Sequence, residues 1–131
     1  MSRALQPGGW KRPRGYSNGI AAHGEAIFIA GQIGWNEREE IVSPDFAEQA
    51  AQALRNVVAV LAAGGAKPEH LVRMTWYVTD KREYRASSKR IGELYREIVG
   101  DVYPAMTLVQ VAALLEDGAK VEIEATAVVP A

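Results

Sequence analysis

The alternation of apolar and polar residues near the C-terminus constrains the fold more than any other feature of this sequence. Residues 121–127 read Val-Glu-Ile-Glu-Ala-Thr-Ala. Successive side chains of a β-strand point to opposite faces, so this segment predicts a strand with one face against a core. Val121, Ile123 and Ala125 are expected to form that face. Residues 103–111 contain a second alternating segment, which predicts another strand.

Other segments predict strands from their composition. Short apolar runs at 20–22 and 26–31, separated by His-Gly-Glu, predict a hairpin. Residues 71–79 are rich in β-branched and aromatic side chains and predict a further strand. Residues 7–19 contain glycine, proline and basic residues, which favour an extended arm.

Two amphipathic helices are predicted between these strands. After Asp45, apolar residues recur every three to four positions as far as Gly64-Gly65, which predicts a helix that ends there. Asp45 with Glu48 has the pattern of a capping box. Residues 84–98 predict a second helix ending near Gly100. The order of elements predicts an α+β fold, a mixed sheet with two helices packed on one face, in a single domain spanning residues 1–131.

Charge and composition disfavour several classes of function. Fifteen Lys and Arg oppose sixteen Asp and Glu, giving a formal charge of -1, so no basic field favours nucleic acid or an anionic membrane. The chain has no cysteine and only two histidines, so neither thiolate catalysis nor a transition-metal site is expected. No apolar run approaches the roughly 18 residues of a membrane span, so a cytoplasmic protein is expected.

Local motifs spread over most of the chain resemble the Rid/YjgF family of reactive-intermediate deaminases. Gly15-Tyr16-Ser17-Asn18 is similar to the family's Pro-Tyr-Ser-Gln, and Ala30-Gly31-Gln32-Ile33 to its Ser-Gly-Gln-Ile. Residues 121–125 are the most literal match. The first predicted helix also follows the family pattern, at Gln49, Leu54, Asn56, Leu61 and Gly65.

This resemblance implies a chorismate-mutase-like fold and a homotrimer with ligand clefts between neighbouring subunits. It also implies a hydrolase that converts a reactive imine or enamine, such as a 2-imino acid, to a carbonyl compound and ammonia without a cofactor. Water is the nucleophile, and the protein holds the substrate and positions the water.

The chain departs from the family pattern at the arginine that binds the substrate carboxylate, where it has Met106. A thioether cannot replace a two-pronged cationic donor. Met106 and Leu108 share one face of their strand, so they predict a cleft for an apolar or aromatic ligand. Alternatively, both side chains fill an apolar contact between subunits.

Glu122 matches the family's catalytic or water-positioning carboxylate. Alternatively, Glu122 and Glu124 decorate a solvated face of the sheet. Tyr16 matches an aromatic lid over the ligand, or it anchors the N-terminal arm. Gly31 is expected to donate its backbone N–H to a substrate oxygen, while Ala30 lacks the hydroxyl that the family often has there.

Three further residues are candidates for the cleft or its surroundings. Lys89, or Ser88 if the following loop differs by one residue, falls at the family's second-helix asparagine. Lys89 either restores the charge lost at Met106 or is a solvated helix lysine. Trp35 is a candidate pocket wall or an exposed turn residue, and Trp76 is expected in the core or between subunits.

The leading interpretation is therefore a divergent Rid/YjgF protein, an imine or enamine deaminase with an altered substrate range. The alternative is a non-catalytic protein that binds or senses a small molecule in the pocket between subunits. RNA cleavage, an older functional label of the family, fits poorly because the chain has no net positive charge and no aromatic-basic stripe.

Overall fold

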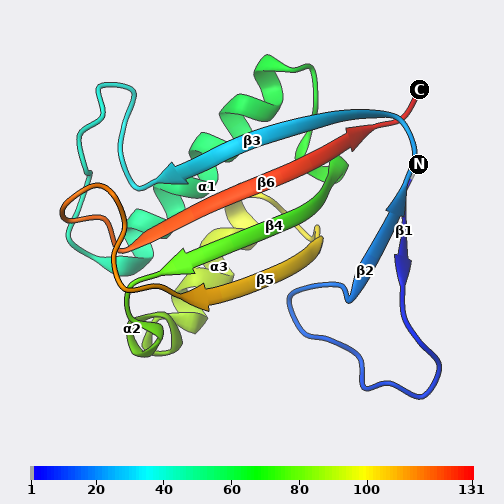
Figure 1. Cartoon of the computed structure of the whole chain (residues 1–131), viewed down its shortest axis with the longest axis horizontal. Coiled ribbons are helices and arrows are strands. Elements are labelled where there is room, and N and C mark those ends of the chain that lie inside the picture. Colours follow the sequence, from blue (N-terminus) through cyan, green and yellow to red (C-terminus); the bar gives the residue numbers. More distant parts are fainter. Residues whose placement is uncertain (1) are drawn as a thin grey trace.

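Four strands form one mixed sheet in the computed structural model, which describes residues 2–131. Their order across the sheet is β3 (Glu25–Ile33), β6 (Val121–Val129), β4 (Leu71–Val78) and β5 (Ala105–Gln110). β6 pairs antiparallel with both of its neighbours, whereas β4 and β5 are parallel. The predicted mixed sheet is confirmed, and Figure 1 shows β6 in its interior.

Helices cover one face of this sheet (Figure 1). They are α1 (Phe46–Ala63), α2 (Lys81–Ala86) and α3 (Ser88–Ile98), and a short 3-10 turn, η1 (Pro68–His70), precedes β4. The helix-covered face holds the core, to which β6 contributes Val121, Ile123, Ala125 and Ala127. The apolar side chains of β6 therefore face the core, as the sequence predicts.

The N-terminus of α1 has only half of the predicted capping box. The Asp45 carboxylate accepts a hydrogen bond from the Glu48 backbone N–H at 2.9 Å. The Asp45 N–H, however, donates to Ser43 Oγ at 3.0 Å, so the reciprocal bond from Glu48 is replaced. The Glu48 carboxylate instead lies 3.6 Å from the Arg90 guanidinium of α3.

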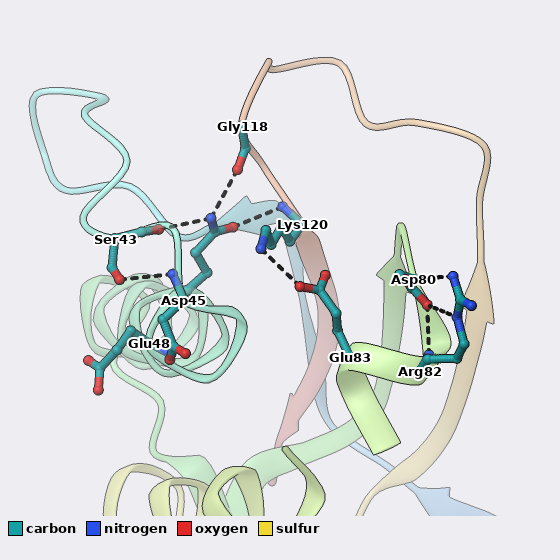
Figure 2. A network of polar contacts seen from close by, with 9 residues as sticks. Ser43, Asp45, Glu48, Asp80, Arg82, Glu83, Gly118 and Lys120 are labelled. Atoms are coloured by element: carbon teal, nitrogen blue, oxygen red, sulfur yellow. Dashed lines mark hydrogen bonds and ion pairs between the residues drawn. The ribbon is translucent and has the colours of Figure 1, made fainter. Parts of the chain in front are cut away.

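A buried glutamine holds α1 against the start of β6. Gln49 is fully buried; its Nε2 donates to the carbonyls of Ser43 and Gly118, and its Oε1 accepts from the Lys120 N–H. These contacts, each 2.8–2.9 Å long, can be followed in Figure 2. The Lys120 ammonium lies 2.9 Å from Glu83 of α2, which extends the network. The network fixes where β6, and thus Glu122, enters the sheet.

The second predicted helix is divided at Ser87 into α2 and α3. Ser87 has ψ near 5°, and its N–H donates to the Glu83 and Tyr84 carbonyls as the C-cap of α2. Its own carbonyl accepts from Ile91 at 2.8 Å, so the same residue begins α3. The apolar spacing continues across this break, which is why the sequence pattern does not reveal it.

The predicted hairpin of residues 20–22 and 26–31 is wrong. β2 (Gly19–Ala22) pairs with β1 (Ser2–Leu5), a strand that the sequence analysis missed, while β3 pairs with β6. Gly24, between β2 and β3, has φ +149°, and a Cβ there would lie 2.0 Å from the Val129 carbonyl oxygen. The chain therefore turns against the end of β6 as it passes from β2 into the four-stranded sheet, and Figure 1 shows the β1–β2 ribbon set apart.

The face of the sheet away from the helices is uncovered. Phe28 is 78% exposed there, although it is a large aromatic side chain in a paired strand.

Within residues 2–131, no helix combines the length and the apolar character needed to cross a bilayer.

Candidate functional site

The predicted site residues form two groups on opposite faces of the sheet. Lys89 and Met106 line a pocket on the helix-covered side. Gly31 and Glu122 lie together on the uncovered face. The sheet separates the two groups within one chain.

The first group belongs to a cavity of about 570 Å³ between α3, β4 and β5, here called the aromatic pocket. Its aromatic walls are Trp76, Tyr84, Tyr95 and Tyr103. The Tyr95 and Tyr103 rings stack with centroids 6.1 Å apart, and Trp76 meets Tyr84 edge-on at 6.0 Å. These pairs hold the walls in fixed orientations.

The electrostatics of the aromatic pocket are one-sided. Lys89, Arg14 and Arg96 contribute to its lining, and no carboxylate does. The Tyr95 hydroxyl donates to the Val102 carbonyl at 2.5 Å, and burial raises the pKa of Tyr95 well above its usual value. Burial also raises the pKa of Tyr84, so both tyrosines stay neutral and the charge of the lining is positive.

The second group, here called the carboxylate site, contains Gly31, Glu122, Glu124 and Tyr77. A Cβ added at Gly31 would lie 1.9 Å from Glu122 Oε2, so the carboxylate occupies the space that glycine leaves open. Gly31 lies in an irregularity of β3, because the register with β6 shifts between Ile29 and Gln32. Such bulges redirect the backbone and are frequent next to active sites.

Glu122 and Glu124 differ in their surroundings. Glu124 Oε1 accepts a hydrogen bond from the Tyr77 hydroxyl at 2.5 Å. That bond, followed by burial and the nearby negative charges, raises the pKa of Tyr77. Glu122 accepts no hydrogen bond from the side chains that the structure describes, although Tyr77 is its register partner. Glu122 is therefore the carboxylate available to a substrate or a water molecule.

The other predicted residues lie outside both groups. Tyr16 is 40% exposed and lines a second hollow that shares Arg14, Gly15 and Tyr103 with the aromatic pocket. Leu108 packs against the core beside Trp76, and Trp35 forms an isolated bridge with Ile41. Ala30 is exposed next to Gly31. Trp76 is 2% exposed, so its predicted place in the core is confirmed.

Several lining residues are not predicted from the sequence. Tyr84 and Tyr95 lie in the predicted second helix and follow its apolar spacing, and Tyr103 lies in the segment that predicts a strand. Arg14 lies in the predicted extended arm, and Arg96 carries no local signal. The alternation of β4 indicates that Tyr77 and Trp76 point to opposite faces of the sheet, but the pairing of Tyr77 with Glu122 depends on strand order.

In residues 2–131 no three His, Asp or Glu side chains are grouped to hold a metal ion.

Comparisons with known proteins agree on the family. A family model described as endoribonuclease L-PSP matches residues 10–129. A RutC family protein of Aquifex aeolicus is 37% identical over 115 residues, 86% of this chain and 87% of the relative. The 2-iminobutanoate/2-iminopropanoate deaminase of Homo sapiens is 35% identical over 103 residues, 78% and 72% of the two chains. The crystal structure of the Rid family protein YyfB from Yersinia pestis has a TM-score of 0.84 at 32% identity and covers 98% of both chains. These matches confirm the resemblance read from the motifs: the chain belongs to the Rid/YjgF family, which the endoribonuclease L-PSP model describes.

Proposed function

We propose that this protein hydrolyses reactive imines or enamines to a carbonyl compound and ammonia. The observation that carries the proposal is the contact of Gly31 with the Glu122 carboxylate at the irregularity of β3. The Glu122 carboxylate accepts no hydrogen bond from the described side chains, and the exposed backbone of Gly31 lies next to it. Relatives about 33–35% identical are named as deaminases of this kind, which supports the same reaction here.

The reaction needs only a water molecule and proton transfers. Glu122 takes a proton from water as the water oxygen adds to the carbon of the protonated imine. The resulting carbinolamine receives that proton on nitrogen. The C–N bond then breaks to release ammonia while Glu122 takes the proton of the hydroxyl group, which leaves the carbonyl, and Glu122 passes this proton to ammonia, which departs as ammonium. The Gly31 backbone holds the substrate next to Glu122. No bound cofactor enters these steps.

We propose further that the complete site forms between copies of the chain, in a homotrimer. Glu122 and Gly31 lie on the uncovered face, whereas Lys89 and Met106 lie on the helix-covered side. One substrate can contact both groups only if a second copy supplies one of them. The aromatic pocket of one copy would then hold the body of the substrate against the carboxylate site of its neighbour.

Ammonia release from 2-imino acids, generated in situ by an amino-acid oxidase, tests the reaction. We expect the native protein to accelerate release and Glu122→Gln to lose about 100-fold or more of that acceleration, the usual contribution of a positioned acid or base. Glu124→Gln is the matched control, since Glu124 is held by Tyr77. It should retain most of the activity.

A non-catalytic binding protein is the second candidate, and Met106 favours it. The family pattern leads us to expect an arginine at that position to hold a substrate carboxylate. If neither the native protein nor Met106→Arg accelerates ammonia release, the deaminase proposal is wrong. A ligand that raises the melting temperature without turnover would then support the binding protein.

A further inference from the structure

Three cationic side chains line the aromatic pocket, and none of its described lining residues carries a carboxylate. Arg14, Lys89 and Arg96 line it, and none of them takes part in the four ion pairs recorded for residues 2–131. All three side chains belong to exposed residues at the rim. Such a cluster beside low-dielectric walls favours an anion.

The walls of the same pocket are suited to a flat ring. Trp76, Tyr84, Tyr95 and Tyr103 surround it, and Met106 adds a polarisable side chain at the strand end. The volume of about 570 Å³ falls within the range of pockets for small organic molecules. Aromatic faces and edges favour planar rings, and a methionine sulfur adds favourable contacts to them.

From these two features we propose that the aromatic pocket binds a planar aromatic carboxylic acid. The ring lies between the aromatic walls, and the carboxylate points to Lys89, Arg14 and Arg96 at the rim. A neutral aromatic molecule would leave the three cations without a partner, and a short aliphatic acid would leave the walls empty. This inference rests on the proposed deaminase function, and it identifies the substrates of that reaction as aromatic imino acids.

Calorimetric binding of three probes to the native protein tests the ligand class without requiring turnover. The probes are phenylpyruvate, pyruvate and phenylacetamide. Phenylpyruvate has both an aromatic ring and a carboxylate, pyruvate has the carboxylate without the ring, and phenylacetamide has the ring without the carboxylate. We expect phenylpyruvate to bind at least about tenfold more tightly than either of the others. Equal affinity for phenylpyruvate and pyruvate, or for phenylpyruvate and phenylacetamide, would overturn the proposal.

Variants then identify the contacts. Lys89→Ala should weaken phenylpyruvate binding about fivefold to tenfold, while Lys81→Ala, an exposed lysine outside the pocket, should not change it. Unchanged affinity in Lys89→Ala contradicts the assigned orientation of the carboxylate.

The two proposals fail separately. Selective binding of phenylpyruvate without ammonia release from any imino acid would support the ligand class and reject the deaminase. Ammonia release from aliphatic imino acids, with no preference for phenylpyruvate over pyruvate, would support the deaminase and reject the ligand class.

Discussion

Gly31 lies so close to the Glu122 carboxylate that any side chain there must displace it. We predict that Gly31→Ala lowers imine hydrolysis at least about tenfold, because the new methyl group moves the carboxylate away from the substrate. The clash extends from Oε2 to Cγ of Glu122 but involves no backbone atom, so the free energy of unfolding should fall by about 1–3 kcal/mol. Ammonia release and urea unfolding measure the two effects.

Gly8→Ala is the matched control, since a Cβ at Gly8 would meet no atom within 4 Å. It should leave both activity and stability unchanged. Full activity in a folded Gly31→Ala variant would contradict the role of this contact.

Sequence alone predicts part of the site at this scale. The alternation in residues 121–127 places Glu122 and Glu124 on one face, as the structure confirms. It does not distinguish the two carboxylates, because their difference depends on Tyr77 and Gly31, which are contributed by the two neighbouring strands. Local periodicity contains no information on which strands are neighbours.

At the scale of elements, the contact between α1 and β6 depends on one buried side chain. We predict that Gln49→Leu lowers the free energy of unfolding by about 3 kcal/mol or more, because it leaves two carbonyls and one N–H without their partner. Urea unfolding measures this loss. Gln52→Leu, which removes one hydrogen bond to Asn56, should cost about 1 kcal/mol or less.

The sequence predicts the elements better than their pairing. The helix over α1 and the strands in 71–79, 103–111 and 121–127 follow from apolar spacing and turn residues, which are local signals. The wrong hairpin and the missed β1 are failures of pairing: β2 finds its partner in Ser2–Leu5, across the arm that the sequence predicts. The break at Ser87 is hidden because both helices share one apolar face.

At the scale of the whole molecule, buried tyrosines should make stability depend on alkaline pH. Burial raises the pKa of Tyr84 and Tyr95 in the folded state above the 10.0 of a free side chain. Their contribution is complete below about pH 10 and is lost as the pH rises through the raised values, because only the unfolded chain then releases the protons. The urea concentration at the midpoint of unfolding should therefore be lower at pH 11 than at pH 8. The fall should be smaller in Tyr84→Phe, and an equal fall would contradict the assignment.

Assembly is the step that neither local periodicity nor one chain can complete, because the two halves of the proposed site face opposite sides of one sheet. We predict that the protein sediments at three times its 14.2 kDa mass, with the exposed Phe28 face buried between copies. Burying one phenylalanine contributes about 1.5–3 kcal/mol, so Phe28→Asp should shift sedimentation towards the monomer. Leu115→Asp, at a side chain 93% exposed in the loop before β6, is the control and should remain a trimer. If the site forms between copies, Phe28→Asp must also lose ammonia release although it leaves Glu122, Gly31 and Lys89 intact. A monomeric Phe28→Asp variant with full activity would show that one chain is sufficient.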